Sequence, residues 1–379
     1  MKKVCHITTV HKAIDGRIFY KECRSLVRQG YVVYVVGVWS KDEQRDGVYI
    51  VGLKEYSGRL KRFFNSFVAM RKAIKTGASV MHLHDPELLL IGFLLKLCGK
   101  KVVFDSHENL YLQLSCETSV KQWVPRPFRR IFAFMYLLVE KLSVRFFDAW
   151  IYVADNPQNP HNFLSAYPRH VHKFYLVRNF PILSLIDNIP SLDIEKKKPI
   201  IIYVGGLTAG RGIYELIEAM HSVRTDATLL LIGQWEGEEY KKKCFNHMPH
   251  GKVEWKDWMP VEKLYGYIKK ADVGMVTILP ELNHMNTFAI KTFEYMACGL
   301  PVIMSDFPFW IHFFGSENAI FVNPSNSAGI AEKIDLLLQD KALAVRLGQN
   351  GRKRVEEELC WEKEQETLFR LYKKLLNED

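Results

Sequence analysis

Apolar and polar positions divide the first half of the chain into short strand-like runs and segments with helical spacing. Runs rich in β-branched residues predict strands at residues 3–10, 31–38, 80–84 and 101–105. Apolar positions three and four residues apart predict helices at residues 18–29, ending at Gly30, and at residues 88–97. Continuous apolar strands that alternate with helices are typical of a parallel sheet covered on both faces.

The second half repeats this alternation. Strands are predicted at residues 199–204, 228–232, 253–255, 273–278, 301–304 and 319–322. Helices are predicted at residues 213–223, 261–270, 291–298 and 328–339, with two or three amphipathic helices from Lys341 onward. The charged residues 193–198 favour a linker. We therefore expect Rossmann-like domains at residues 1–190 and 191–379, and the terminal helices of the second can pack back on the first.

The composition agrees with a two-domain organisation, and it also shows a net positive charge. The chain has 379 residues, 48% hydrophobic and 25% charged, which suits two globular domains rather than a disordered chain. Its formal net charge of +10 favours an anionic partner, such as nucleotide phosphates, a lipid phosphate or a membrane surface. A solvated basic surface is the alternative. The sequence has no nucleic-acid-binding signature, so we expect no nucleic-acid partner.

The cysteines and the apolar runs bear on location. Seven cysteines lie at irregular spacings without a Cys-x-x-Cys pair, which favours a reducing compartment over a disulfide framework. The N-terminus carries no signal-peptide core, and the most apolar runs are too short to span a bilayer. We therefore expect a cytoplasmic protein.

Residues 283–301 carry the most informative motif. A loop enters a helix that ends at Gly299, and a helix N-terminus offers unpaired N–H groups and a positive dipole end to a diphosphate. Lys291 lies in the first turn of this helix. Glu294 lies one turn further, where a carboxylate can accept hydrogen bonds from both ribose hydroxyls. The alternative is a buried amphipathic helix with a surface carboxylate.

The run F-A-I-K-T-F-E-Y-M-A-C-G-L-P-V-I in this motif resembles the donor-binding motif of family-4 retaining glycosyltransferases of the GT-B fold. The resemblance implies that Glu294 contacts the ribose. It also implies that backbone amides hold the sugar and phosphate at Thr287, Phe288, Ala289 and Ile290. The family's first glutamate, which contacts donor-sugar hydroxyls, is replaced here by Asn286. An amide can still bind a hydroxyl but brings no charge.

Residues 204–212 read V-G-G-L-T-A-G-R-G, a glycine-rich turn between a strand and a helix. This turn resembles the family's phosphate loop, in which an arginine and a lysine grip the diphosphate. Arg211 matches the lysine, and the arginine position falls on or near Gly206, so one cation is missing. Lys291 can compensate for it. A purely surface role for Arg211 is the alternative.

Residues 104–110 read F-D-S-H-E-N-L and follow a predicted strand. His107 matches the family's histidine near the donor sugar, and a histidine can bind a hydroxyl and handle a proton. Asp105 and Glu108 are alternatives. The nearby run His-Leu-His-Asp-Pro-Glu at residues 82–87 has the residue types of a metal cluster. We do not expect one, because enzymes of the family hold the diphosphate without a metal.

The first strand-to-helix loop, at residues 8–19, contains Asp15, Gly16 and Arg17. Many family members have paired glycines here, against the diphosphate. The form H-x-x-x-D-x-R-I-F resembles a bacterial surface-polysaccharide subgroup. We expect Gly16 near the donor and Arg17, with Asp15, near a phosphate or the acceptor. A loop stabilised by an Asp15–Arg17 contact is the alternative.

Residues 121–147 combine basic and aromatic side chains in a helical pattern that suits an anionic membrane surface. An ordinary packed helix with basic residues outward is the alternative.

The resemblance as a whole implies an α/β protein of the GT-B fold, with two Rossmann-like domains facing a central cleft. It implies retaining transfer from a UDP- or GDP-sugar to a glycan or polyprenyl-linked acceptor in surface polysaccharide synthesis, without cofactor or metal. Two alternatives stay open. One is a sugar-nucleotide epimerase on the same fold. The other is a non-catalytic or membrane-associated partner subunit, which Asn286 and Gly206 favour.

Overall fold

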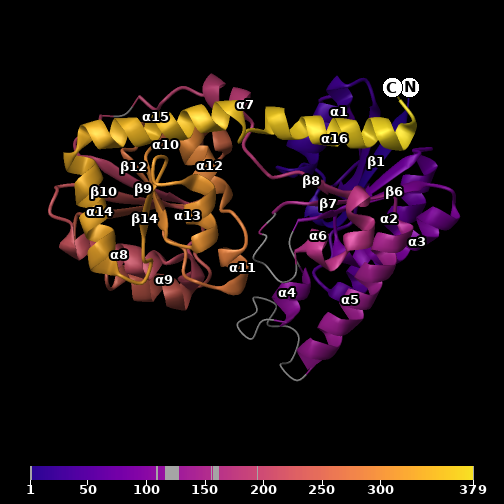
Figure 1. Cartoon of the computed structure of the whole chain (residues 1–379), viewed down its shortest axis with the longest axis horizontal. Helices are drawn as coiled ribbons and strands as arrows, with labels where there is room; N and C mark the ends of the chain where they lie inside the picture. Colours follow the sequence, from indigo (N-terminus) through magenta and orange to yellow (C-terminus); the bar gives the residue numbers. More distant parts are fainter. Residues whose placement is uncertain are drawn as a thin grey trace. The chain divides into compact units, whose positions relative to one another are not determined.

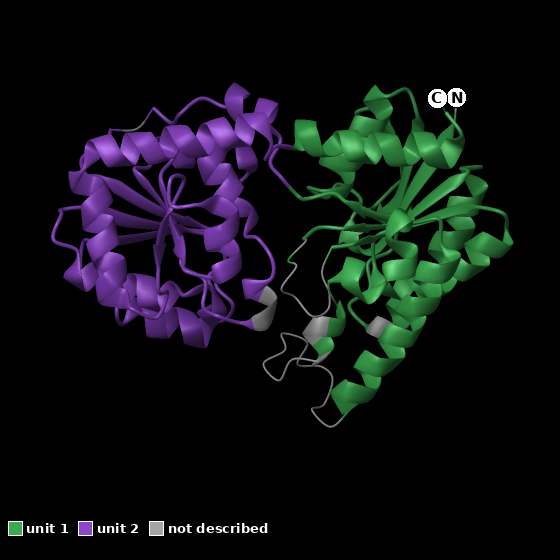
Figure 2. Cartoon of the chain, in the orientation of Figure 1, with its two compact units in different colours: residues 1–179, 361–379 green, residues 180–360 purple. Residues whose placement is uncertain are grey.

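The structure of the chain is a computed structural model that describes residues 2–107, 110–115, 128–154, 156, 162–193 and 195–378. Two compact units make up the chain (Figures 1 and 2). Unit 1 comprises Met1–Asn179 with Trp361–Asp379, and unit 2 comprises Phe180–Cys360.

Unit 1 is built on an eight-stranded sheet of order β3-β4-β2-β1-β5-β6-β7-β8, in which only the β3–β4 pair is antiparallel. Its strands are β1 Lys3–Lys12, β2 Val32–Val38, β3 Glu43–Arg45, β4 Val48–Leu53, β5 Val80–Leu83, β6 Lys101–Ser106, β7 Ala149–Tyr152 and β8 Phe174–Leu176. Every residue of β5 and β7 is buried, as expected of strands covered on both faces.

Helices cover both faces of this sheet. They are a π-helix η1 Ile18–Cys23, α1 Arg24–Arg28, α2 Arg59–Lys75, the 3₁₀ turn η2 Pro86–Leu88, α3 Leu89–Leu97, α4 Leu110–Ser115, α5 Arg129–Phe146, α6 Phe163–Ala166, the 3₁₀ helix η4 Pro168–Lys173 and the C-terminal α16 Trp361–Leu376. The carboxylate of Asp15 accepts the backbone N–H groups of Arg17 and Ile18, which starts η1. The predicted helix at residues 18–29 therefore exists, but its first half is a π-helix.

Unit 2 is built on a six-stranded, fully parallel sheet of order β11-β10-β9-β12-β13-β14. Its strands are β9 Ile200–Val204, β10 Thr228–Ile232, β11 Val253–Lys256, β12 Val273–Val276, β13 Val302–Ser305 and β14 Ile320–Val322. Its helices are α7 Leu183–Asn188, η5 Ala209–Arg211, α8 Ile213–Ser222, α9 Glu238–Phe245, α10 Val261–Lys270, α11 Leu282–Met285, α12 Ile290–Ala297, α13 Pro308–Phe314, α14 Ser327–Gln339 and α15 Lys341–Glu357.

The unit 2 sheet separates two apolar cores. Alternate residues of a strand point to opposite faces, so Ile202 and Val204 of β9 lie in one core while Ile201 and Tyr203 lie in the other. The carboxyl ends of the strands are thereby held at one edge of a rigid sheet.

The division between the units differs from the boundary expected near residue 190. Ile186 and Ile189 of the expected N-terminal domain are buried in the core of unit 2. Lys269 donates hydrogen bonds to the carbonyl oxygens of both. The chain therefore enters unit 2 at residue 180.

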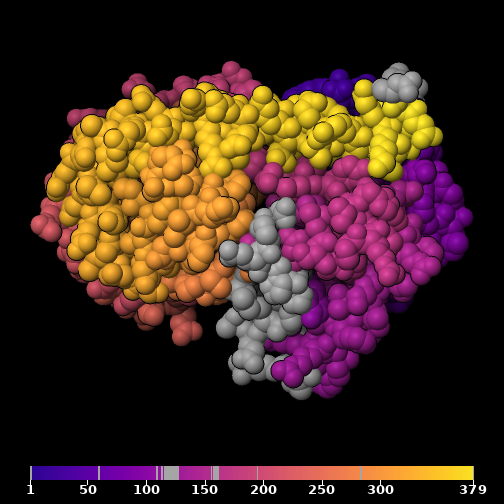
Figure 3. Space-filling model, viewed as in Figure 1, coloured from indigo at the N-terminus to yellow at the C-terminus, as the bar shows by residue number. Residues whose placement is uncertain are grey.

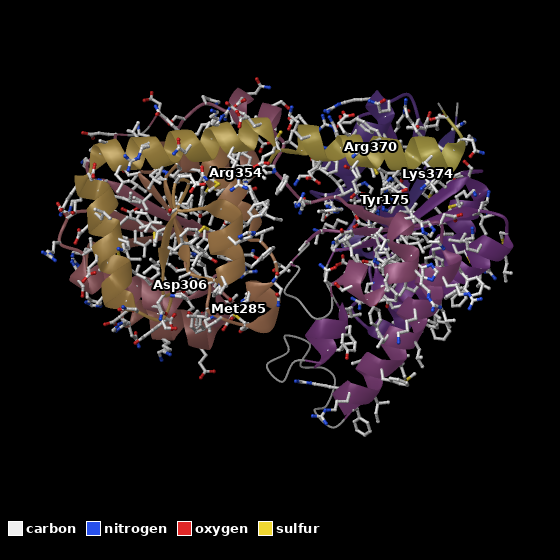
Figure 4. All side chains as sticks on the ribbon, in the orientation of Figure 1. Tyr175, Met285, Asp306, Arg354, Arg370 and Lys374 are labelled. Atoms are coloured by element: carbon white, nitrogen blue, oxygen red, sulfur yellow. The ribbon has the colours of Figure 1, made fainter. Side chains whose placement is uncertain are left out.

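The last helix, α16, belongs to unit 1. Trp361 Nε1 donates to Ser25 Oγ at 2.9 Å, and Lys374 Nζ donates to Tyr175 Oη at 3.1 Å (Figure 4). In the space-filling view, residues of α15 and α16 (yellow) lie at the surfaces of their units (Figure 3). The six cysteines among the described residues are free thiols. No helix in the described ranges is long and apolar enough to cross a membrane.

Candidate functional site

The predicted donor residues converge at one point of the unit 2 sheet. The strand order reverses between β9 and β12, and doubly wound sheets bind ligands beyond the carboxyl ends of the strands at such a reversal. The turn after β9 contains Gly206 and Arg211, and the segment after β12 contains residues 286–291. The sequence motifs therefore lie where this sheet topology places a ligand.

The turn after β9 is tight and requires glycine. Gly212 has a φ of 69°, and a Cβ there would lie 2.0 Å from the carbonyl oxygen of Thr277. A Cβ at Gly205 would lie 3.1 Å from Lys291 Nζ, so the ammonium rests almost against the backbone of the turn. At Gly206 the nearest neighbour of a Cβ would be Thr208 Cγ2 at 3.6 Å, an ordinary contact.

Lys291 lies in the first turn of α12, as predicted. Its Nζ lies 3.6 Å from the centroid of the Tyr203 ring. Burial and then the charge of Arg211 hold the pKa of Lys291 well below its ordinary value, while Glu294 acts in the opposite direction. The charge of Arg211 thus disfavours the charge of Lys291 near the end of β9, and a bound anion would stabilise the charged form of Lys291.

Glu294 lies one turn along α12 from Lys291, and its position is fixed by a neighbouring helix. Tyr265 of α10 donates its hydroxyl to Glu294 Oε1 at 2.9 Å. Burial and the adjacent carboxylate raise the pKa of Tyr265, so the tyrosine remains a donor. A carboxylate held in this way is preorganised to accept further hydrogen bonds.

The segment that precedes α12 is anchored by aromatic packing. Trp310 Nε1 donates to the carbonyl oxygen of Thr287 at 2.8 Å. The ring of Phe288 packs against Phe309 and Phe313, with centroid distances of 4.6 and 4.3 Å. The side chain of Phe288 therefore belongs to the core of unit 2, and only its backbone is available for the predicted donor contact.

The other residues of this segment are placed at the two helix ends. Asn286 ends α11 and is half-buried. Ala289 is the N-cap of α12 and accepts the N–H of Thr292 at 3.0 Å. Ile290 is 39% exposed and begins the helix. The N-terminus of α12 therefore points its first N–H groups toward the same strand ends as Lys291.

His107 follows β6 of unit 1 and is only partly buried. Its Nε2 lies 3.2 Å from His84 Nδ1 and 3.3 Å from Asp105 Oδ2. Although burial disfavours the charge of Asp105, Arg17 and then His107 hold the pKa of that carboxyl well below its usual range. A charged carboxylate thus orients the histidine, which suits proton handling.

The two alternatives to His107 have different outcomes. Asp105 has no exposed surface, so it can act on a ligand only through His107. Glu108 lies outside the described residues.

The structure gives Arg17 a different place from the one expected. The side chain is 4% exposed, and its Nε lies 2.8 Å from Asp105 Oδ2 and 2.9 Å from Glu22 Oε1. Asp15 accepts the backbone N–H of Arg17 rather than its guanidinium. In this structure Arg17 is therefore buried in the interior of unit 1, and Asp15 caps the start of η1. Gly16 is exposed and has ordinary backbone geometry.

The acidic residues of the run 82–87 also have hydrogen-bond or ion-pair partners within unit 1. Asp85 Oδ2 accepts the hydroxyl of Thr8 at 2.8 Å and the backbone N–H of Thr9 at 2.6 Å. Glu87 accepts the Thr9 hydroxyl at 3.0 Å and pairs with Arg62. Both carboxylates bind the C-terminal half of β1 and do not form a cluster with the histidines of the same run.

Several residues of these sites could not be found from local motifs. Tyr203 and Tyr265 support the two charged residues of α12, and His6, Glu22 and Tyr372 surround the histidines of β5. They come from distant segments, and only the tertiary structure brings them together.

Comparison with known proteins agrees with this geometry. Residues 186–354 match the family model of glycosyl transferases group 1. The chain is 27% identical over 192 residues to the capsular polysaccharide biosynthesis glycosyltransferase CapM of Staphylococcus aureus, covering 46% of this chain and 47% of that protein. The chain spans about half the length of the curated relatives it matches.

Solved structures match over nearly the whole chain. Sucrose-phosphate synthase from Thermosynechococcus elongatus has a TM-score of 0.76 at 20% identity, covering 100% of both chains. HepE from Anabaena, in complex with UDP and glucose, has a TM-score of 0.73 at 13% identity, covering 99% of this chain and 100% of that one. The chain therefore has the GT-B fold, and residues 186–354 are similar to the family of glycosyl transferases group 1.

Proposed function

We propose that the protein is a retaining glycosyltransferase that transfers a sugar from a UDP- or GDP-sugar to a glycan or polyprenyl-linked acceptor. One observation carries the proposal: Lys291, Arg211 and the N-terminus of α12 gather cationic and N–H groups at the strand reversal of unit 2. Glu294 lies one turn along α12 from Lys291, where its carboxylate can bind the ribose hydroxyls. The nucleotide in the HepE structure and the name of CapM support a nucleotide-sugar donor and a polysaccharide product.

In this proposal the diphosphate leaves while its developing charge is stabilised by Lys291, Arg211 and backbone N–H groups of α12. Retention by a same-face route needs no protein nucleophile, because the leaving diphosphate itself accepts the proton of the attacking hydroxyl. In this proposal His107 handles a proton in the transfer reaction, and Asp105 holds its ring in place. In this proposal Lys291, Arg211 and the N-terminus of α12 hold the diphosphate without a metal.

A metal-free thermal-shift screen against UDP, GDP, CDP, dTDP and ADP tests the donor site. A ligand that binds only the folded protein at a hundred times its dissociation constant stabilises it by about 2.7 kcal/mol. We expect a shift with UDP or GDP that Glu294→Ala diminishes and that the exposed Glu332→Ala retains. Equal shifts in both variants would remove the ribose role of Glu294.

The same screen separates the alternatives. A folded protein that binds none of the nucleotides would be a non-catalytic partner subunit. An epimerase would convert the sugar nucleotide without any acceptor, which product analysis detects.

A basic hollow in unit 1 suits the acceptor. A cavity of about 590 Å³ lies among the residues that follow β1, β2 and β4. Its lining includes four lysines, two acidic residues and one tryptophan, namely Lys12, Lys41, Lys54, Lys72, Asp42, Glu55 and Trp39. Excess positive charge beside an aromatic ring fits a glycan that carries a carboxylate or a phosphate.

An apolar face on unit 1 supports membrane contact. Helices α2, α3 and α5 are adjacent (Figure 1), and each carries exposed apolar residues at helical spacing. They are Leu60, Phe64 and Val68 of α2, Leu90, Leu94 and Leu97 of α3, and Ile131, Phe132, Phe134, Met135, Leu138, Leu142 and Phe146 of α5. The membrane-binding surface predicted at residues 121–147 would therefore also include helices α2 and α3. Residues 121–127 themselves lie outside the described part of the chain.

Exposed basic residues border this face, including Lys61, Arg71, Arg130 and Lys141. Apolar side chains beside basic ones suit the interface of an anionic bilayer. We expect the protein to float with anionic liposomes and to lose this property in Phe134→Glu/Leu138→Glu. Protein that stays at the bottom of the gradient would contradict membrane docking.

A further inference from the structure

A cluster of buried histidines in unit 1 has no role in the proposed reaction. His6 of β1 pairs in register with His82 of β5, and His84 follows two residues later on the same face of the sheet. Glu22 approaches from η1. His6, His82 and Glu22 have no exposed surface, and His84 is 3% exposed.

The facing atoms of three of these residues have the spacing of metal ligands. His6 Nδ1 lies 3.0 Å from His84 Nε2, and Glu22 Oε2 lies 3.6 Å from the first nitrogen and 3.8 Å from the second. Ligand atoms about 2.1 Å from one zinc ion are roughly 3.4 Å apart in a tetrahedron. One atom of His82 joins them, and all four ligand atoms lie within 4.8 Å of one another.

Each histidine uses its other ring nitrogen for an outer partner. The hydroxyl of Tyr372 lies 2.8 Å from His82 Nδ1 and 3.3 Å from His6 Nε2. Asp105 Oδ2 lies 3.6 Å from His84 Nδ1. Outer carboxylates and hydroxyls of this kind fix the tautomer and orientation of histidines that bind metals.

Two of the four candidate ligand residues have buried atoms without hydrogen bonds, whereas His6 Nδ1 and His84 Nε2 lie within hydrogen-bond distance of each other at 3.0 Å. His82 Nε2 and both carboxylate oxygens of Glu22 are buried and have no hydrogen-bond partner among the described residues. Arg17 lies beside Glu22 but directs its Nε–H to Asp105. Buried polar atoms are normally paired, so His82 Nε2 and Glu22 Oε2 indicate a missing ligand, whereas Glu22 Oε1 lies 2.9 Å from Arg17 Nε.

The ligand types also favour a cation, since three imidazoles and one carboxylate face one another. Imidazole and carboxylate ligands suit zinc and neighbouring divalent transition metals. Full burial and three or four protein ligands are typical of a closed structural site rather than a catalytic one.

We propose that His6, Glu22, His82 and His84 bind one divalent transition-metal ion, zinc by preference, as a structural centre of unit 1. The ion joins β1, β5 and η1, and its outer partners connect it to α16 through Tyr372 and to His107 through Asp105. This site is separate from the predicted donor residues of unit 2, and it does not rest on the proposed function.

The test uses the untagged full chain expressed in zinc-supplemented medium, with metal content measured by mass spectrometry. We expect about one zinc per chain in the wild type and far less in Glu22→Gln. The matched control is Glu218→Gln in the surface group Glu218, His221 and His247, a group among the described residues that shares no member with the proposed site and could bind an ion adventitiously. Zinc lost only in Glu218→Gln would overturn the proposal.

A second variant guards against a folding failure of Glu22→Gln. Tyr372→Phe keeps the buried ring and removes the outer hydrogen bonds, and we expect its zinc affinity to fall about 10–100-fold. Chelator-stripped wild type titrated with cobalt should show the visible absorption of a four-coordinate ion. Protein that is purified without metal and takes up neither cobalt nor zinc would overturn the proposal.

Discussion

Two basic residues, Arg17 after β1 of unit 1 and Lys291 after β12 of unit 2, have opposite surroundings. Arg17 lies between two carboxylates, at 2.8 Å from Asp105 and 2.9 Å from Glu22. These neighbours outweigh burial and raise the pKa of Arg17. Lys291 lies over an aromatic ring beside another cation, and its pKa is lowered well below the ordinary value by burial and by Arg211.

The difference separates a structural charge from a binding charge. A buried cation with its own carboxylates is already compensated and has nothing to offer a diphosphate. A cation that lacks such compensation gains stability when an anion arrives. The sequence favoured a diphosphate contact for Lys291 and a phosphate or acceptor contact for Arg17, and only their surroundings in the structure distinguish them.

Replacing the compensated cation should have the largest effect on stability. Arg17→Met leaves two buried carboxylates without their partner, and breaking a buried ion pair costs about 3–5 kcal/mol. We expect a large fall in the free energy of unfolding, measured by urea denaturation. Lys291→Met is the matched control and should leave the ligand-free protein as stable as the wild type or more so. Equal losses of unfolding free energy in both variants would contradict the distinction between a structural charge and a binding charge.

His107 joins the unit 1 network to the proposed chemistry. His107→Ala should lower turnover about 10²–10⁴-fold, the usual contribution of a positioned acid or base, while donor affinity changes little. Steady-state transfer assays and nucleotide titrations measure the two effects separately. The exposed His172 of η4 provides the control, since His172→Ala should retain both. Unchanged turnover in His107→Ala would contradict its placement.

Much of the fold could be predicted because each unit is an alternation of buried strands and helices. The bounds of β10 and α10 match the prediction, since an apolar run and an amphipathic period define them locally. The hairpin of β3 and β4 was not predicted. Its Asp46-Gly47 turn is a hairpin signal, but β3 is polar and short. Helix α2 was also not predicted, because exposed Leu60 and Phe64 blur its polar face.

The candidate sites also contain residues that a local motif predicts and residues that only the tertiary structure brings together. Lys291 and Glu294 lie in one contiguous motif, so their spacing on one helix could be predicted from sequence. The partners of Arg17 could not, because Asp105 lies 88 residues away and only the sheet brings it close. The hydrogen bond between Tyr372 and His82 spans 290 residues and has no local signature.

Replacing the uncompensated cation should chiefly weaken donor binding. Lys291→Met removes a charged partner of the diphosphate, and hydrogen bonds to charged groups contribute about 1.5–3 kcal/mol. We expect UDP or GDP affinity to fall roughly tenfold to a hundredfold in isothermal titrations. Retained affinity would show that the lowered pKa of Lys291 is a feature of packing alone.

The pH dependence of binding sharpens the comparison further. The pKa of Lys291 is lowered in the ligand-free protein, and an adjacent diphosphate would raise it again. Between these two values binding takes up a proton, so affinity should decrease as pH rises through this range. Without ligand, the unfolded chain binds more protons there, and stability should increase with pH.

Titrations in two buffers of different ionisation enthalpy measure this proton uptake. Lys291→Arg should reduce it, because arginine stays protonated with and without ligand. Equal uptake in the variant and the wild type would assign the proton to the nucleotide or to another residue.

The smallest expected effect is an increase in nucleotide affinity. A side chain at Gly206 would meet only Thr208 Cγ2 at 3.6 Å, so the turn can accept the arginine that the family carries on or near this position. Gly206→Arg should tighten nucleotide binding about three- to tenfold, as a partly exposed charge-assisted contact contributes roughly 0.5–1.5 kcal/mol. The control Gln339→Arg adds the same charge at the exposed end of α14. If both variants bind equally more tightly, the gain comes from net charge alone. If only Gly206→Arg does, the turn is a phosphate site that lacks one cation, and Lys291 compensates for it only in part.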